Sequence, residues 1–150
     1  MTHWIMNGKA RVAAAAIGAM LALSACGHKA AAGSGGGGNG LTVGSESLTG
    51  IGSVLDNSRG FTLYHLTTDS SSMTTCTGGC AQVWPPLLSP TGKVPASPGV
   101  MGSFGLLKRP DGGLQVTYNG MPLYRYVGDS GPGQSHGQGI GNVWFAVKVA

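Results

Sequence analysis

The side chains best suited to chemistry occur in one spacing that the chain carries twice. A tyrosine, an aspartate and a tryptophan follow one another as Tyr64, Asp69 and Trp84 and again, at the same intervals, as Tyr124, Asp129 and Trp144. Aromatic faces together with carboxylates receive sugars or cationic groups. The candidate ligand-binding residues are four of these and one more aromatic, namely Tyr64, Asp69, Tyr124, Tyr126 and Asp129.

A structural interpretation of these residues is favoured over ligand binding. Buried tyrosines bond their hydroxyl to a partner, here expected to be a backbone group, and an aspartate at a strand end accepts N–H groups from its own turn. If the strands alternate normally, Tyr124 and Tyr126 share one face of the sheet, as Tyr64 and Leu66 do. That face is therefore expected to be either core or a partly exposed groove.

Asp69 and Asp129 are also the best candidates for catalysis. Two carboxylates about 5–10 Å apart permit general acid and base hydrolysis. The other arrangements that support catalysis are missing from the sequence, because the serines lie in turns and linkers, His65 and His136 have no evident orienting partner, and no Gly-rich segment joins a strand to a helix. The sequence favours a non-enzymatic protein without catalytic residues over this hydrolase.

Cys26 ends a segment that has the features of an export signal. Lys9 and Arg11 precede an uncharged, Ala-rich apolar run over residues 12–22, which is the order of regions in a secretory signal peptide. The run is shorter than the roughly 20 apolar residues that span a membrane. Residues 23–26 (Leu-Ser-Ala-Cys) resemble the lipobox of bacterial lipoproteins, which implies cleavage just before Cys26 and a diacylglycerol thioether on its sulfur.

Two acyl chains give a stable membrane anchor where one does not. Residues 1–25 are thus predicted to be a signal peptide, and residues 26–40 the lipidated cysteine with a Gly-rich tether. Such a tether spans roughly 20 Å. We expect the folded domain, residues 41–150, to lie on the extracytoplasmic face of the cell membrane, with the membrane as partner through the lipid and an unknown envelope ligand or protein as a second.

Cys76 and Cys80 are the two thiols that remain after lipidation. In an exported protein, a pair separated by Gly78 and Gly79 favours a disulfide, and closing so short a loop stabilises by only about 2 kcal/mol. The alternative is a metal, haem or redox module in which these cysteines and His136 bind copper, zinc or haem iron. Because the chain has no dense Cys/His cluster, the sequence favours no cofactor.

The charge of the chain does not indicate a nucleic-acid partner. The formal net charge is +4, but Lys9 and Arg11 lie in the predicted signal, and a mature chain near +2 attracts polyanions weakly. Lys108 and Arg109 form the one adjacent basic pair and precede a Pro-Asp-Gly-Gly turn. We expect both side chains to be solvated at the end of a strand.

Shifting the sequence by 60 residues aligns the two halves without a gap, which indicates an internal duplication. The expected boundaries are repeat 1 at about residues 43–88, a connector at 85–102 and repeat 2 at about 103–150. The connector contains a Pro-rich stretch, residues 85–98, that is expected to continue neither a sheet nor a helix.

Each repeat is predicted to contain a β-hairpin. Residues 114–118 and 121–127 flank Asn119-Gly120, a pair that favours a type I′ turn. Residues 53–55 and 61–67 form a looser version of the hairpin, and residues 143–149 form the last strand. The predicted fold is all-β, a single small domain of two pseudo-symmetric hairpin-based repeats, sandwich or barrel-like, packed around the two tryptophans of the repeated pattern.

The chain resembles a family of bacterial secreted-repeat lipoproteins that share the motif Tyr-x-(Phe/Trp/Tyr)-x-x-Asp. Residues 124–129 match the motif at every fixed position, whereas residues 64–69 have Leu66 where an aromatic is expected. Further family-like segments are residues 76–81, 84–87 and 137–139. The resemblance covers about residues 41–150, implies lipidation and export, and carries no agreed biochemical function. The sequence therefore predicts a lipid-anchored envelope lipoprotein with a binding or structural role.

Overall fold

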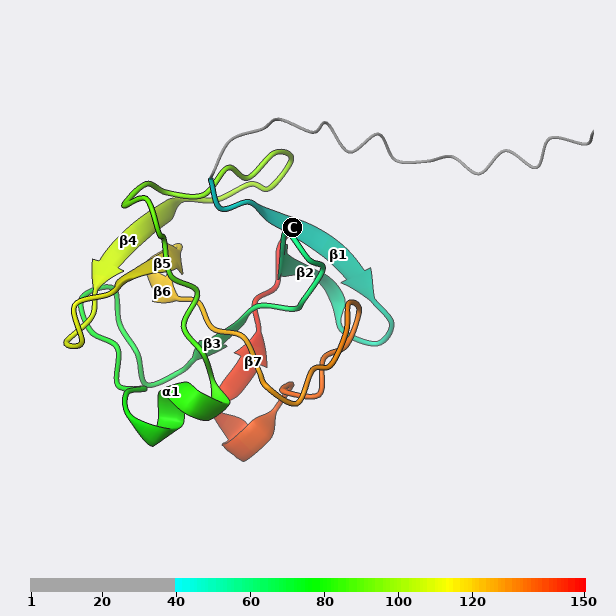
Figure 1. The fold of residues 1–150 in the computed structure, drawn as a ribbon. Coiled ribbons are helices and arrows are strands. Elements are labelled where there is room, and N and C mark those ends of the chain that lie inside the picture. Colours follow the sequence, from blue (N-terminus) through cyan, green and yellow to red (C-terminus); the bar gives the residue numbers. More distant parts are fainter. Residues whose placement is uncertain (1–39) are drawn as a thin grey trace, which may run out of the picture. The chain divides into compact units, whose positions relative to one another are not determined.

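A computed structural model describes residues 40–150, and Figure 1 shows the fold. The predicted signal peptide, Cys26 and the tether through residue 39 lie outside the described residues. Within the described part, no helix is long and apolar enough to cross a membrane.

The domain is built mostly of short strands in three open sheets. Antiparallel pairs join β1 (Val43–Leu48) to β2 (Gly52–Asn57), β3 (Tyr64–Leu66) to β7 (Trp144–Ala146), and β4 (Phe104–Lys108) to β5 (Leu114–Tyr118), which also pairs with β6 (Met121–Pro122). The helical elements are α1 (Gly79–Val83) and the 3-10 helix η1 (Ile140–Asn142). The all-β prediction is confirmed, and the three sheets remain separate.

The turn of the predicted hairpin in the second repeat is confirmed, but its second strand, expected over residues 121–127, is only β6, and the last strand, expected over residues 143–149, is only β7. β5 and β6 flank Asn119 and Gly120, whose φ angles of 48° and 81° are both positive, as a type I′ turn requires. In the first repeat, the side chain of Asn57 closes the longer turn, because its Oδ1 accepts the N–H groups of Arg59 at 2.9 Å and Phe61 at 3.1 Å.

Two equivalent sets of three backbone hydrogen bonds each join three separate segments in a closed cycle. Leu55 donates its N–H to the carbonyl of Val147, Val147 donates to Leu63, and Leu63 donates to Leu55. The equivalent cycle joins Val116, Leu87 and Leu123. The hairpin of the first repeat is therefore one residue longer than that of the second, so the alignment by 60 residues slips by one position there.

The last segment of each repeat pairs with the backbone of the other repeat. Tyr64 and Tyr124 exchange two backbone hydrogen bonds of 2.9 Å, which places these equivalent residues next to each other at the centre. β7, from the end of the second repeat, pairs with β3 of the first. In the matching position, the N–H of Arg125 donates to the carbonyl of Pro85 at 2.8 Å.

The start of the Pro-rich stretch differs from its prediction, because backbone pairing continues through it. Pro86 forms a bridge with Tyr124, Leu87 donates to Leu123, and Ser89 donates to Leu114. Pro85 takes part through its carbonyl oxygen, so its missing N–H costs no bond there. The irregular connection thus starts after Ser89.

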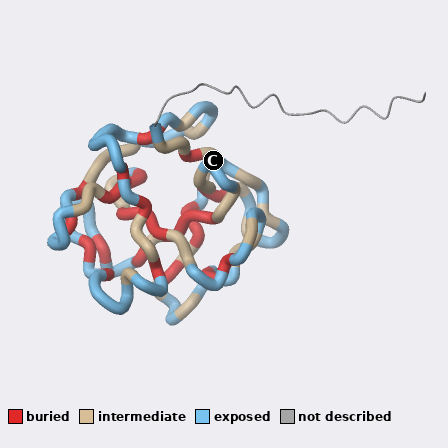
Figure 2. The backbone as a smooth tube through the Cα atoms, in the orientation of Figure 1, coloured by how far each residue is buried: buried red, intermediate tan, exposed pale blue. Residues whose placement is uncertain are grey.

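Two tryptophans lie at the centre of the buried part, as the duplication predicts. Trp84 and Trp144 stack with ring centroids 3.9 Å apart and planes inclined by 4°. Both are at most 6% exposed. Figure 2 shows the buried segments running through the middle of the domain. A second cluster of buried apolar residues surrounds Leu63 and Leu123.

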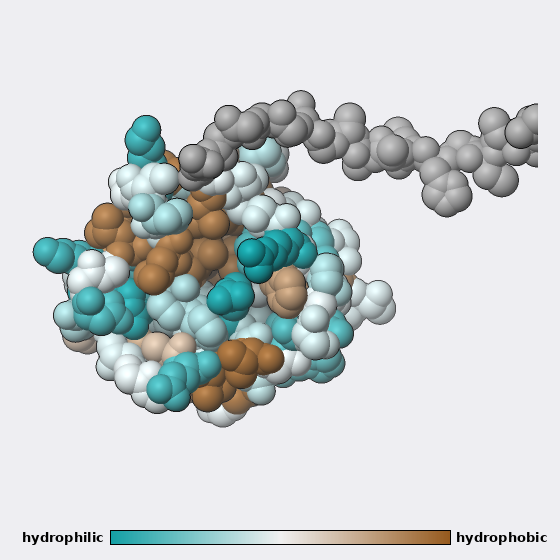
Figure 3. Space-filling view, in the orientation of Figure 1, coloured by the Kyte–Doolittle hydropathy of each residue, from teal (hydrophilic) through white to brown (hydrophobic). Residues whose placement is uncertain are grey.

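Several large apolar side chains are exposed on the surface of the domain. The large exposed ones are Met73, Val83, Leu88, Val94, Met101 and Val127. On the face shown in Figure 3, brown apolar areas are separated by polar side chains.

Candidate functional site

The predicted Tyr and Asp residues come together as two crossed pairs between the repeats. The hydroxyl of Tyr64 donates to Oδ2 of Asp129 at 2.7 Å. The hydroxyl of Tyr124 donates to Oδ2 of Asp69. Each tyrosine therefore bonds the aspartate of the other copy. The backbone partner that the structural interpretation expected is present for Tyr64, whose hydroxyl oxygen also accepts the N–H of Gly137 at 3.3 Å.

The second oxygen of each carboxylate orders its own loop. Oδ1 of Asp69 accepts the N–H of Thr75 at 2.8 Å and its hydroxyl at 2.7 Å. Oδ1 of Asp129 accepts the N–H of His136 at 2.9 Å. This confirms the expectation that the aspartates accept N–H groups from their own turns. Both oxygens of each carboxylate are engaged within the fold.

Four of the five candidate ligand-binding residues are buried. The two tyrosines have no exposed surface, and Asp69 and Asp129 are also buried. Tyr126 is partly exposed and stacks on Trp84 with centroids 4.4 Å apart. Ligand binding and carboxylate hydrolysis at these residues stay predictions, and the contacts described here give the residues a structural role.

Burial also affects the acidity of the two phenols. Burial, with the hydrogen bond to Asp69, raises the pKa of Tyr124 from its ordinary value of 10.0 to about 12. Burial and the hydrogen bond to Asp129 raise the pKa of Tyr64 as well. In both cases the neutral phenol is favoured, because an anion would face a carboxylate inside the protein.

The raised pKa values predict that alkaline pH weakens the domain. The unfolded chain loses its phenolic protons near pH 10, while the folded chain keeps the proton of Tyr124 up to about pH 12. Since the folded state binds more protons in this window, the stabilisation is complete below pH 10 and is lost as the pH rises. We expect the free energy of unfolding, measured by denaturant titration, to fall between about pH 10 and 12, and to fall less steeply in Tyr124→Phe. An equal slope in that variant would contradict the assignment.

A double-mutant cycle tests the crossed pairing. Tyr64→Phe and Asp129→Asn should each lower the free energy of unfolding by about 1–3 kcal/mol, because each leaves a buried polar group with one bond fewer. The two changes should couple by about 0.5–3 kcal/mol in urea unfolding, since the residues share the bond. Tyr64→Phe combined with Asp111→Asn is the control and should be additive within about 0.5 kcal/mol. Additivity in the first cycle would mean that the pair is not formed.

The predicted disulfide is present between Cys76 and Cys80, whose Cα atoms are 5.2 Å apart. Cys76 is buried and Cys80 is exposed, at the start of α1. His136 belongs to a different cluster, with Nδ1 3.3 Å from Oδ1 of Asp129. Among residues 40–150, no three His, Cys, Asp or Glu side chains are grouped as metal ligands.

Arg109 is buried, so the expectation of a solvated strand end is wrong for this residue. It is 2% exposed. Its guanidinium donates to Oε1 of Gln115 at 2.7 Å, to the carbonyl of Cys76 at 2.9 Å and to both carboxylate oxygens of Asp111. Lys108 is exposed as expected. A buried guanidinium is tolerated here because acceptors from three segments satisfy it.

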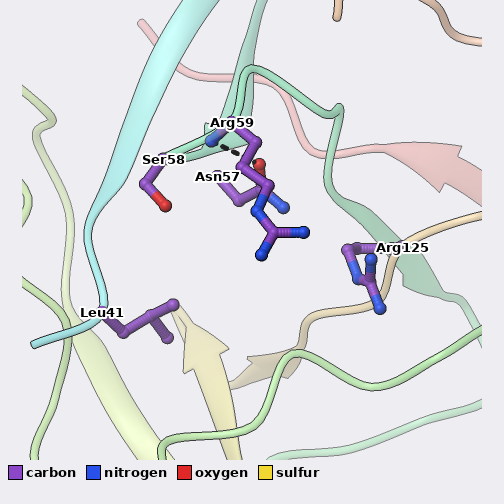
Figure 4. Close-up of a pocket in the computed structure, with 5 residues that line it drawn as sticks. All are labelled: Leu41, Asn57, Ser58, Arg59 and Arg125. Carbon is purple, nitrogen blue, oxygen red and sulfur yellow. Dashed lines mark hydrogen bonds between the residues drawn. The ribbon is translucent and has the colours of Figure 1, made fainter. Parts of the chain in front are cut away.

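A small surface cavity brings together residues that the sequence analysis did not single out. Leu41, Asn57, Ser58, Arg59 and Arg125 line a volume of about 260 Å³. Figure 4 shows the two arginines, one from each repeat, at the same opening. No sequence signal pointed to this pair, because Arg59 and Arg125 come from different repeats and meet only in the fold.

Comparisons with known proteins support the duplication. A family model described as a secreted repeat of unknown function matches residues 48–88 and 105–148. The two matched segments correspond to the two repeats. No curated protein and no solved structure matches the chain significantly.

Proposed function

Since the chain belongs to a family of secreted repeats of unknown function, we propose that it is a lipid-anchored extracytoplasmic protein with a non-enzymatic binding role at the cell envelope. The domain serves as a rigid support for a small polar site. Cys26 attaches the support to the membrane.

The anchor is supported by the order of features at the start of the chain. A basic segment, an apolar run and the lipobox-like residues 23–26 precede Cys26, in the order of a signal that ends at a modified cysteine. Residues 26–40 have the Gly-rich composition of a flexible tether between the anchor and the domain.

The cavity that Arg59 and Arg125 line is the observation that supports the binding role. Its lining residues come from the turn after β2, from the start of the domain and from Arg125 of the second repeat. The turn is held by Asn57, and Arg125 lies in the crossed backbone pairing. A site whose walls are fixed before the ligand arrives loses less entropy on binding.

Mass spectrometry of the protein purified from its native membrane tests the anchor. We expect a chain that begins at Cys26 and carries a thioether-linked diacylglycerol. Cys26→Ala should lose both the lipid and the cleavage. Ser34→Ala, in the tether, serves as the control and should be processed normally. Recovery of the unprocessed wild-type chain in the cytosol would overturn the proposal.

A further inference from the structure

We infer that the cavity lined by Leu41, Asn57, Ser58, Arg59 and Arg125 binds the phosphate group of a phosphate ester. The inference rests on the proposed binding function and names the chemistry of its ligand.

Arg59 is held in place by a turn that is fixed on both sides. Asn57 Oδ1 accepts the N–H groups on either side of Gly60, and the N–H of Gly60 donates to the carbonyl of Asn57 at 2.8 Å. Gly60 has a φ of 77°, and a Cβ there would lie 2.9 Å from Cβ of Pro132 in the other repeat. The turn therefore packs closely against the second repeat, which fixes the base of the arginine side chain.

Arg125 is held by the crossed pairing at the centre of the domain. Its N–H donates to Pro85, and its neighbour Tyr124 pairs with Tyr64. The side chain of Arg125 is partly exposed and is one of those that line the cavity. Figure 4 shows Arg59 and Arg125 among the residues that line the cavity.

The cavity carries positive charge without a matching acid. No Asp or Glu lines it. Neither Arg59 nor Arg125 forms a side-chain hydrogen bond or an ion pair with another described residue. Two cations at one small opening repel each other, so an anion bound between them would gain from both.

The donors favour a phosphate oxyanion. Each guanidinium presents a planar set of N–H donors that matches phosphate oxygens in pairs. The Oδ1 of Asn57 is already used by the turn, so its amide NH₂ is left to donate, and Ser58 adds a hydroxyl. Donors from four side chains suit a tetrahedral anion better than a single carboxylate.

Leu41 and the size of the cavity favour an ester over the free ion. Leu41 adds an apolar wall to the volume of about 260 Å³, and a wall of this kind suits the carbon part of an organic phosphate. Phospholipid headgroups and soluble phosphate esters share the required chemistry.

Calorimetric titration of the mature protein in a neutral detergent tests the site. The probes are glycerol 3-phosphate, inorganic phosphate, dihexanoyl phosphatidylglycerol and, as the uncharged control, glycerol. We expect saturable binding of the esters, weaker binding of inorganic phosphate and none of glycerol. Tighter binding of the short-chain lipid than of glycerol 3-phosphate would assign the site to a lipid headgroup, and the reverse order would assign it to a soluble ester.

Charge-matched variants separate a built site from general attraction. Arg59→Gln and Arg125→Gln should each weaken binding of the esters about 10-fold to 100-fold, as expected for the loss of a charge-assisted hydrogen bond. Lys108→Gln removes one exposed positive charge elsewhere and should leave the affinity unchanged. Near-ultraviolet circular dichroism confirms that each variant is folded.

Four outcomes are decisive against one proposal or the other. The absence of saturable ester binding by the folded protein, or an equal effect of Lys108→Gln, would overturn the phosphate site. Release of inorganic phosphate from glycerol 3-phosphate would contradict the non-enzymatic role while leaving the site in place. A protein that binds the esters but lacks lipid on Cys26 would contradict the anchor alone.

Discussion

Trp144→Ala is expected to lower the free energy of unfolding by about 3–5 kcal/mol, which is the usual loss when a buried tryptophan is truncated. Trp144 is stacked on Trp84 and meets the ring of Tyr124 edge-on at 5.1 Å. Removing it leaves a void between the two repeats, where both aromatic neighbours lose contact. Since small domains are stable by only about 5–15 kcal/mol, a large part of the total is expected to disappear.

Urea or guanidinium unfolding followed by circular dichroism measures this loss. Trp144→Phe should recover part of it, because an aromatic ring still fills some of the space. Val127→Ala is the control, since Val127 is 58% exposed, and should change the free energy by less than about 0.5 kcal/mol. If Trp144→Ala were as mild as this control, the tryptophan pair would not be the centre of the core.

Arg109→Met is expected to cost about 2–4 kcal/mol of unfolding free energy. Methionine retains much of the apolar stem, so the main loss is the guanidinium. Its removal leaves Oε1 of Gln115 and the carbonyl of Cys76 without a buried donor, and each unsatisfied group costs about 1–3 kcal/mol. The partner carboxylate of Asp111 is largely exposed, so water can solvate it.

The neighbouring residue provides the control for this change. Lys108→Met removes the same charge one position earlier, from an exposed side chain, and should alter stability by less than about 0.5 kcal/mol. Hydrogen exchange adds a second measurement, because losing the bond to Cys76 should speed exchange in the disulfide loop. Equal stability of the two variants would show that the buried network contributes nothing.

Local chemistry made several elements predictable from sequence. Asn119 and Gly120 have the residue types that a type I′ turn requires, and the structure forms that turn. The cysteines are separated by only three residues, so no distant partner had to be identified. The repeated Trp spacing predicted the central aromatic pair, because each copy supplies one large apolar side chain at the same position and Trp84 stacks on Trp144.

β1 was not predicted, because this strand depends on its pairing partner and not on the strand preference of its own residues. β1 consists of Val, Gly, Ser, Glu, Ser and Leu, a composition with little strand preference. It forms because β2 offers a complete antiparallel register from Val43↔Asn57 to Leu48↔Gly52. Propensity alone could not identify such a strand.

The pairing of each Tyr with the Asp of the other repeat and the burial of Arg109 could not be predicted from sequence, because both depend on partners distant in the chain. An identical Tyr-to-Asp interval in both copies fits pairing within a repeat as well as pairing between repeats. Arg109 is buried only because Cys76 and Gln115 bring acceptors to it, and sequence distance conceals this. Arg59 and Arg125 likewise meet only after the two repeats have assembled.

The exchange of end segments has a consequence for how such a molecule could arise. β3 lies beside β7, which is supplied by the opposite copy, and each phenol finds its carboxylate there as well. A polypeptide with one copy would lack all of these partners and could gain them only by pairing with a second identical molecule. A homodimeric ancestor, later fused into one gene, therefore needs no change of architecture to become this chain.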